Sequence, residues 1–224
     1  MKEEKLDMQE LISSFPDEFL KLNLKEQRLS TQLYRFLAEG QPVSTERLAN
    51  DLNLSSNDVT NILNKWPGVY YNQDNYIIGY WGLALPKMSH RFAINGHTLY
   101  TWCAWDSLFI PEIINKTAHV ESTCPVTGKK IQLTVTPDGI EELNPAIAVM
   151  SFVTPESSKV RENVISSFCH YIHFFISAEA GSKWKSNNEG TFILSIDEAY
   201  YLGRKKNEAQ YKDVFGTKSE SGIA

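Results

Sequence analysis

The chain has 224 residues, of which 42% are hydrophobic and 22% are charged, and its formal net charge is −5 at pH 7. This composition is typical of a globular protein with one or two domains. The negative charge argues against nucleic acids and anionic membranes as partners, because both are bound through concentrated Lys and Arg. No apolar run reaches the roughly 18–20 residues that span a bilayer, and no signal peptide is recognisable. We therefore expect no nucleic-acid partner, no membrane contact and a cytoplasmic location.

The first eighty residues carry the apolar periodicity of helices. Leucines and an aromatic residue recur at helical spacing from Leu29 to Leu37, and Gly40 is placed to end that helix. Ser44 stands as the N-cap of a second helix, TERLANDL. A third helix is expected to begin at Ser55 or Ser56. Three short helices in sequence are thus predicted.

A hairpin follows these helices. The segment YYNQDNYIIGY predicts two short strands joined by a turn at Asn72–Asn75. Helix, turn, helix and hairpin together predict a winged-helix-like domain over residues 1–83. The helix that would read DNA, SSNDVTNILNK, has one Lys, one Asp and no Arg. A packing scaffold is therefore favoured over a DNA-binding domain.

Residues 84–224 change to the composition of strands. Segments rich in Val, Ile, Thr and aromatic residues predict strands at HRFAING, HTLYTW, AHVEST, KIQLTVT, AIAVMSFV, SFCHYIHFFIS and GTFILSI. A hairpin turn is predicted at CPVTGKK and a terminal helix at DEAYYLGRKKNEAQYKDVF. The expected fold is α+β, in which the winged-helix-like domain precedes a mixed or antiparallel β-sheet domain with flanking helices.

Three cysteines and one aspartate are the candidate reactive residues. Cys103, Cys124 and Cys169 are too few and too scattered for a disulfide framework or a zinc finger. The segment TWCAWDSLFIP predicts a short helix stopped by Pro111, which puts Cys103 and Asp106 on one face at positions i and i+3. A carboxylate raises the pKa of a neighbouring thiol, so this pair suits proton exchange better than protease-type nucleophilic attack.

The other two thiols allow simpler interpretations. Cys169 lies in the predicted strand SFCHYIHFFIS, where a cysteine is most often inert core packing. A zinc site made by Cys103, Cys169 and His173 stays open on residue type alone. Cys124 precedes Pro125 at the predicted hairpin and is expected to be structural.

Two segments resemble the alkylmercury lyases, the organomercurial lyases of bacterial mercury-resistance systems: HTLYTWCAWDSLFIPEIINKTAHVESTCPVTGKKIQLTV and, further along, SSFCHYIHFFIS. The resemblance extends from about residue 30 to the terminal helix. It implies that the carbon–mercury bond of alkyl- and arylmercury compounds is cleaved by protonolysis to a hydrocarbon and Hg(II). It further implies that Cys103, Asp106 and Cys169 catalyse this step and hold the Hg(II) product, with Cys124 structural.

The same resemblance implies that no organic cofactor takes part, that low-molecular-weight thiols assist turnover and that a mercuric reductase accepts Hg(II). One departure is visible, because some family members carry a second cysteine where this chain has His170. We expect this difference to cause no loss of activity. Because His170 stands next to Cys169, we expect the difference to affect how Hg(II) is released.

The chemistry of the residues agrees with this assignment. Mercury is a soft metal and thiolate is the softest protein ligand, so two cysteines can close on one mercury centre. Asp106 can take a proton from sulfur and return it to carbon as a general acid. Two alternatives remain open, namely a winged-helix regulator that senses a thiophilic metal through Cys103 and Cys169, and a metal-binding module without turnover. The residues do not indicate which organic groups are accepted or the oligomeric state.

Overall fold

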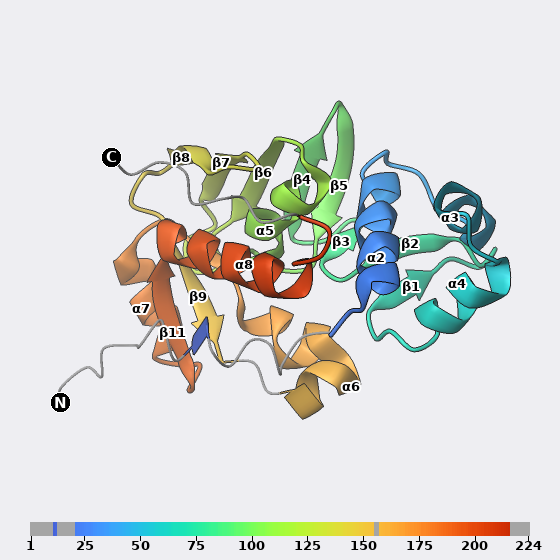
Figure 1. Ribbon diagram of the computed structural model, residues 1–224. Coiled ribbons are helices and arrows are strands. Elements are labelled where there is room, and N and C mark those ends of the chain that lie inside the picture. Colours follow the sequence, from blue (N-terminus) through green and yellow to red (C-terminus); the bar gives the residue numbers. More distant parts are fainter. Residues whose placement is uncertain (1–10, 13–20, 155–156, 216–224) are drawn as a thin grey trace, which may run out of the picture.

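The computed structural model describes residues 11–12, 21–154 and 157–215, and it contains two antiparallel sheets with helices packed around them (Figure 1). Its helices are α2 Leu24–Leu37, α3 Thr45–Leu52, α4 Ser56–Leu63, α5 Asp106–Ile114, α6 Ser157–Ser167, α7 Ala178–Lys185 and α8 Ile196–Gln210. Eight strands form the larger sheet, in the order β1-β2-β3-β5-β4-β6-β7-β8. Their bounds are β1 Val69–Tyr71, β2 Ile77–Tyr80, β3 Leu83–Ala84, β4 His90–Ile94, β5 His97–Thr101, β6 Ala118–Thr123, β7 Lys130–Val135 and β8 Ile140–Asn144. The smaller sheet has the order β10-β9-β11, with β9 Val149–Val153, β10 Phe174–Phe175 and β11 Thr191–Ser195.

The three predicted N-terminal helices are confirmed, and local capping explains where they begin. The Ser44 hydroxyl accepts a hydrogen bond from the Arg47 N–H at the start of α3. The Ser55 hydroxyl does the same for the Asp58 N–H at the start of α4. Helix α2 begins after an Asn23 capping box and buries its leucine face.

The hairpin β1–β2 is also confirmed, with Asn75 in the left-handed region at φ 61°. Through β3 it continues directly into the sheet of the second half, so one antiparallel sheet runs across the 83/84 boundary. This arrangement confirms the α+β class and the antiparallel sheet. The winged-helix-like character of residues 1–83 and the division at residue 84 stay predictions.

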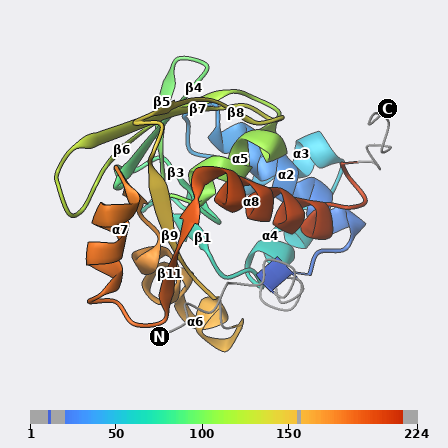
Figure 2. The ribbon, with the colours of Figure 1, turned by 90° about the vertical axis from the view of Figure 1, so that its left-hand side faces the viewer.

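Helix α5 is the centre of the molecule. It packs against α2 and α8 on one side and against β6 and β7 on the other (Figures 1 and 2). Every side chain in it is buried except Glu112, which is partly exposed. At Gly203 of α8, an added Cβ would lie 2.8 Å from Phe109 Cβ, so only glycine allows α8 to lie this close to α5.

The prediction for TWCAWDSLFIP is wrong in its bounds. Residues 102–105 form a turn, α5 begins only at Asp106, and Pro111 lies inside the helix instead of stopping it. The turn is favoured because the Asp106 carboxylate accepts the Cys103 N–H and the Ser107 hydroxyl donates to the Ala104 carbonyl. The helix continues past Pro111 because its surface is almost entirely buried, and burial outweighs the local preference of proline.

The prediction of a strand over SFCHYIHFFIS is wrong for most of that segment. Cys169–Tyr171 forms a 3₁₀ turn after α6, and only Phe174 and Phe175 pair with β9. The sequence of the segment resembles a buried strand because it is apolar at both odd and even positions. The structure explains this apolar composition by burial of its phenylalanines. The Phe168 ring packs against the rings of Trp105 and Phe152 in the interior, which requires an apolar residue without requiring a strand.

The remaining strand predictions and the terminal helix are confirmed as β4 to β7, β9, β11 and α8. The CPVTGKK turn is closed by hydrogen bonds between Cys124 and the backbone of Gly128 and Lys129. Strand β8 and helices α6 and α7 had no counterpart in the predictions. Within the described residues, no helix is both long enough and apolar enough to cross a membrane.

Candidate active site

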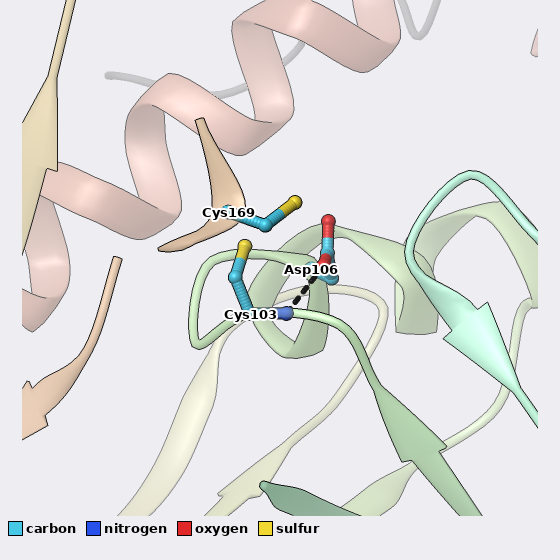
Figure 3. Close-up of side chains that lie close together, drawn as sticks. All are labelled: Cys103, Asp106 and Cys169. Atoms are coloured by element: carbon cyan, nitrogen blue, oxygen red, sulfur yellow. Dashed lines mark hydrogen bonds between the residues drawn. The ribbon is translucent and has the colours of Figure 1, made fainter. Parts of the chain in front are cut away.

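Two thiols and one carboxyl group meet in the interior of the molecule. One potential ligand atom each from Cys103, Asp106 and Cys169 lies within 4.8 Å of the others, and the three side chains point into a common space (Figure 3). All three are buried, with exposed fractions of 0%, 6% and 5%. Among the described residues, they form the one such group of three or more potential metal ligands.

The turn after β5 positions Cys103 and Asp106. The Asp106 Oδ2 atom accepts a hydrogen bond of 2.8 Å from the Cys103 N–H, and the Thr101 hydroxyl donates to the Cys103 carbonyl over 2.9 Å. Asp106 is the first residue of α5, where the positive end of the helix dipole favours a carboxylate. The carboxyl group and the first thiol therefore belong to one rigid turn.

Cys169 comes from the 3₁₀ turn that follows α6. A backbone hydrogen bond of 3.3 Å from the Ala104 N–H to the Ile172 carbonyl ties this turn to the turn carrying Cys103. The ring of Phe168, the residue before Cys169, lies 5.9 Å from the Trp105 ring and anchors the start of this turn in the interior. These contacts bring the second thiol opposite the first, although the two lie far apart in the sequence.

The pKa of the Asp106 carboxyl group is shifted toward neutral pH. Burial raises its pKa to about 6, and this rise is limited by hydrogen bonds from the thiol and the N–H of Cys103 and by the positive charge of Lys206. Lys206 is itself buried, with its Nζ 3.9 Å from the centre of the Phe109 ring. Burial lowers the pKa of Lys206 to about 7, against the opposing effect of Asp106 and Glu112.

Both thiols of the site are protonated at neutral pH. Burial, the hydrogen bond with Cys169 and the charge of Asp106 raise the pKa of Cys103 well above its ordinary value. A hydrogen bond with Cys103 lowers the pKa of Cys169, but burial and Asp106 outweigh it, so that pKa is raised as well. A metal that binds both sulfurs must therefore displace protons, and the neighbouring carboxylate can receive one of them.

A family model for alkylmercury lyase matches residues 83–207, which is more than half of the chain. The chain belongs to the alkylmercury lyase family. It is 38% identical over 172 residues to an alkylmercury lyase of Staphylococcus epidermidis, covering 77% of this chain and 78% of that protein. It is 39% identical over 175 residues to an alkylmercury lyase of Pseudomonas putida, covering 78% and 81% of the two chains.

The fold is also that of a solved structure, "Crystal structure of the mercury-bound form of MerB2". The TM-score is 0.71 at 21% sequence identity, and the match covers 92% of this chain and 100% of that chain. At this identity the likeness concerns the fold, including the mixture of helices and antiparallel sheet described above.

The other candidate residues lie outside the buried group. The ring of His173 packs against the rings of Trp184 and Phe175. The third potential ligand beside Cys103 and Cys169 is Asp106 and not His173, which a zinc site would have used. His170 is exposed on the 3₁₀ turn. Cys124 is buried at the β6–β7 turn, apart from the other two thiols.

Two residues near the site were not found from the sequence. Lys206 could have been found, because it continues the apolar face of Ala199 and Leu202 at helical spacing, where a lysine is unexpected. Gly82 could not, because its contact with Asp106 depends on how the β2–β3 turn meets α5.

Proposed function

We propose that Cys103, Asp106 and Cys169 are the residues with which this enzyme cleaves the carbon–mercury bond of alkyl- and arylmercury compounds. As a member of the alkylmercury lyase family, the chain is an organomercurial lyase. One observation carries the assignment of residues: two buried thiols and a buried carboxyl group lie within 4.8 Å of one another. The products are a hydrocarbon and Hg(II).

Substrate capture takes place on sulfur. An organomercurial held by a small thiol exchanges it for one of the two cysteines, and the proton of that cysteine leaves with the small thiol. The second cysteine then coordinates mercury and transfers its proton to the Asp106 carboxylate. Because the pKa of Asp106 is about 6, the carboxylate is largely ionised at pH 7 and can accept this proton.

Protonolysis follows from the same arrangement. With two thiolates on mercury, the electron pair of the carbon–mercury bond becomes basic enough to take a proton. Asp106, now a carboxylic acid, gives its proton to that carbon, so the carbon–hydrogen bond forms as the carbon–mercury bond breaks. The carboxylate is restored, the hydrocarbon leaves and Hg(II) stays on Cys103 and Cys169. No electron is exchanged with any other group.

Aromatic side chains around the site support this chemistry in two ways. Trp105, which lies between Cys103 and Asp106 in the chain, is buried and packs against the rings of Phe109, Phe152 and Phe168. Trp102, the residue before Cys103, lies edge-on to the ring of the half-exposed Tyr70 at a ring distance of 5.2 Å. An apolar organic group suits such surroundings, and excluded water cannot compete for the proton.

We propose that the protein needs no organic cofactor, that low-molecular-weight thiols remove Hg(II) from the two sulfurs and that a mercuric reductase accepts it. We also propose a cytoplasmic location. All three cysteines are free and buried, which suits a compartment that keeps thiols reduced.

Turnover on an organomercurial tests the proposal. The purified protein is incubated with phenylmercury and excess thiol, and benzene is measured by gas chromatography. We expect catalytic benzene release that depends on all three residues. Stoichiometric mercury binding without benzene would instead indicate a metal-binding module.

For residues 1–83 we propose a winged-helix-like domain that serves as a packing scaffold and not as a DNA reader. Helix α4 carries no Arg, and the relatives reported above are named lyases, none of them a regulator. A gel-shift assay on promoter DNA tests this proposal. A sequence-selective, salt-resistant shift at nanomolar protein would favour a metal-sensing regulator.

A further inference from the structure

The turn between β2 and β3 lies directly against the carboxyl group of Asp106. A Cβ atom added to Gly82 would stand 2.5 Å from both Cγ and Oδ1 of Asp106 and 2.9 Å from its Cβ. These distances are far shorter than a van der Waals contact, so any side chain at Gly82 would displace the carboxyl group. Gly82 also has φ +99°, a conformation that residues with a side chain rarely adopt.

This turn is held in place by three hydrogen bonds. The Trp81 N–H donates to the Gly68 carbonyl over 3.1 Å, and the Trp102 N–H donates to the Gly82 carbonyl over 2.9 Å. The Tyr34 hydroxyl donates to the Trp81 carbonyl over 2.6 Å. Trp81 is held at φ 31°, which is uncommon for a residue other than glycine and shows that its surroundings determine the turn.

Helix α2 supplies the third of these bonds. Tyr34 is fully buried, and its ring lies 4.9 Å from that of Tyr80, the last residue of β2. The Tyr80 hydroxyl in turn donates to the Ser30 hydroxyl, one turn earlier in α2. The turn is therefore fastened to a helix that contains no residue of the catalytic group.

We propose that Gly82 is a positioning residue for Asp106, and that Tyr34 holds the turn on which Gly82 lies. This inference rests on the proposed function, in which Asp106 moves a proton from sulfur to carbon. Of the two carboxyl oxygens, Oδ2 accepts the Cys103 N–H, and Oδ1 faces the bare backbone of Gly82. The backbone of Gly82 therefore limits movement of the carboxyl group on the Oδ1 side, while the Cys103 N–H holds Oδ2.

The consequence for catalysis follows from distance. A proton donor acts only when it is within hydrogen-bond reach of the atom that it protonates. A misplacement of about 1 Å can cost on the order of 100-fold in rate. Capture of the organomercurial on the first cysteine is an exchange with a small thiol and needs no proton acceptor, so displacement of the Asp106 carboxyl group should slow cleavage more than capture.

The test compares Gly82→Ala with Gly96→Ala. Both glycines have positive φ values, +99° and +81°, but a Cβ at Gly96 meets nothing within 4 Å. The control thus introduces a similar backbone strain without the contact. Each variant receives one equivalent of phenylmercury, mercury retained after gel filtration measures capture, and benzene measures cleavage. We expect Gly96→Ala to match the wild type and Gly82→Ala to capture phenylmercury but release benzene about 10- to 100-fold more slowly.

A double variant separates a positioning role from a structural one. If Gly82 acts only through Asp106, Gly82→Ala should cause no further loss of cleavage in an Asp106→Asn background. Equal benzene release by Gly82→Ala and Gly96→Ala would overturn the inference. A parallel loss of capture and cleavage in Gly82→Ala would also overturn it, because a carboxyl group moved out of place leaves both thiols intact.

Failure of the proposed function would give a different result, since Asp106→Asn alone would then cleave at the wild-type rate. If Gly82→Ala does not fold, Tyr34→Phe decides by the same measurements. It removes only the bond to the Trp81 carbonyl, and we expect retained capture with a severalfold slower release of benzene that vanishes in the Asp106→Asn background. Unchanged release in Tyr34→Phe would then count against the inference.

Discussion

The thiols of Cys103 and Cys169 and the thiol of Cys124 are all buried, yet their surroundings differ in a decisive way. The first two share one space with each other and with the carboxyl group of Asp106, and the pKa of each is raised. Cys124 lies in a hairpin turn, where burial raises its pKa but hydrogen bonds from Thr127 and nearby backbone groups outweigh burial and lower it. The lone thiol is thus the more acidic one.

In the proposed mechanism, thiol acidity therefore does not distinguish the catalytic thiols from Cys124. A soft metal displaces the thiol proton on binding, so a high pKa is no obstacle when a base lies alongside. What the metal needs is a second sulfur at the right distance, and what the carbon needs is a proton donor beside both. The group around Cys103 offers all three, and the turn around Cys124 offers a single sulfur.

The largest effect is expected from Cys103→Ser. The substitution replaces one of the two sulfurs on which cleavage is proposed to depend by a hydroxyl oxygen. This oxygen is a hard ligand and binds mercury weakly. Benzene release should fall below detection, while circular dichroism should show an unchanged fold. Near-normal turnover would show that Cys103 is not catalytic, and Cys103 would then be a structural thiol like Cys124.

Asp106→Asn should separate capture from cleavage. The amide keeps the shape of the side chain but cannot carry a proton. Thiol exchange should therefore still capture phenylmercury on sulfur, while benzene release falls by about 100-fold or more. Bound mercury after gel filtration and benzene by gas chromatography measure the two steps. Benzene release at the wild-type rate would mean that another group supplies the proton.

The pH profile should show the carboxyl group directly. Asp106 must be ionised to receive the thiol proton, so single-turnover cleavage should fall as the pH drops through about 6, by about 10-fold per pH unit below it. A profile that stays flat from pH 7 to pH 5 would contradict this role.

Lys206→Met sharpens the same measurement. The ammonium of Lys206 lowers the pKa of Asp106, so its removal should move the acid limb to higher pH. The difference from the wild type should vanish at alkaline pH, because Asp106 is then ionised in both proteins. Lys205→Met is the matched control, since Lys205 is partly exposed and its ammonium pairs with Glu208. Identical limbs in both variants would show that Lys206 does not act on Asp106.

The smallest effect on chemistry is expected from Cys124→Ser. The substitution disturbs a buried turn, and we expect a loss of about 1–2 kcal/mol in the free energy of unfolding, or several degrees in the thermal midpoint. Turnover per folded molecule should not change. An unchanged midpoint with lost turnover would reverse the roles given to Cys124 and the other thiols.

The predictions from sequence succeeded where structure is local. The starts of α3 and α4 follow from Ser44 and Ser55, whose hydroxyls cap the next turn, and the β6–β7 hairpin follows from its Pro and Gly. The nearness of Cys103 and Asp106 follows from their spacing, although a turn and not a helix provides it.

Tertiary contacts set the limit of these predictions. The resemblance to a family named Cys169 as a partner of Cys103, but no local pattern could, because the 3₁₀ turn that presents it depends on Phe168 packing against Trp105. The contact between Gly82 and Asp106 likewise joins two turns that are separate in the sequence. Such contacts appear only once the sheet and α5 are assembled.

The bond between Trp105 and α8 has a consequence for synthesis on the ribosome. The Trp105 Nε1–H donates to the Ala199 carbonyl over 2.9 Å, across 94 residues of chain. At about 5–20 residues per second, the turn that carries Cys103 leaves the ribosome roughly 5–20 s before its partner helix is made. During that interval the growing chain holds thiols without a finished site around them. Mercury that reached the chain in that interval would meet thiols that are not yet held beside a proton donor, so we expect carbon–mercury cleavage only after α8 has docked.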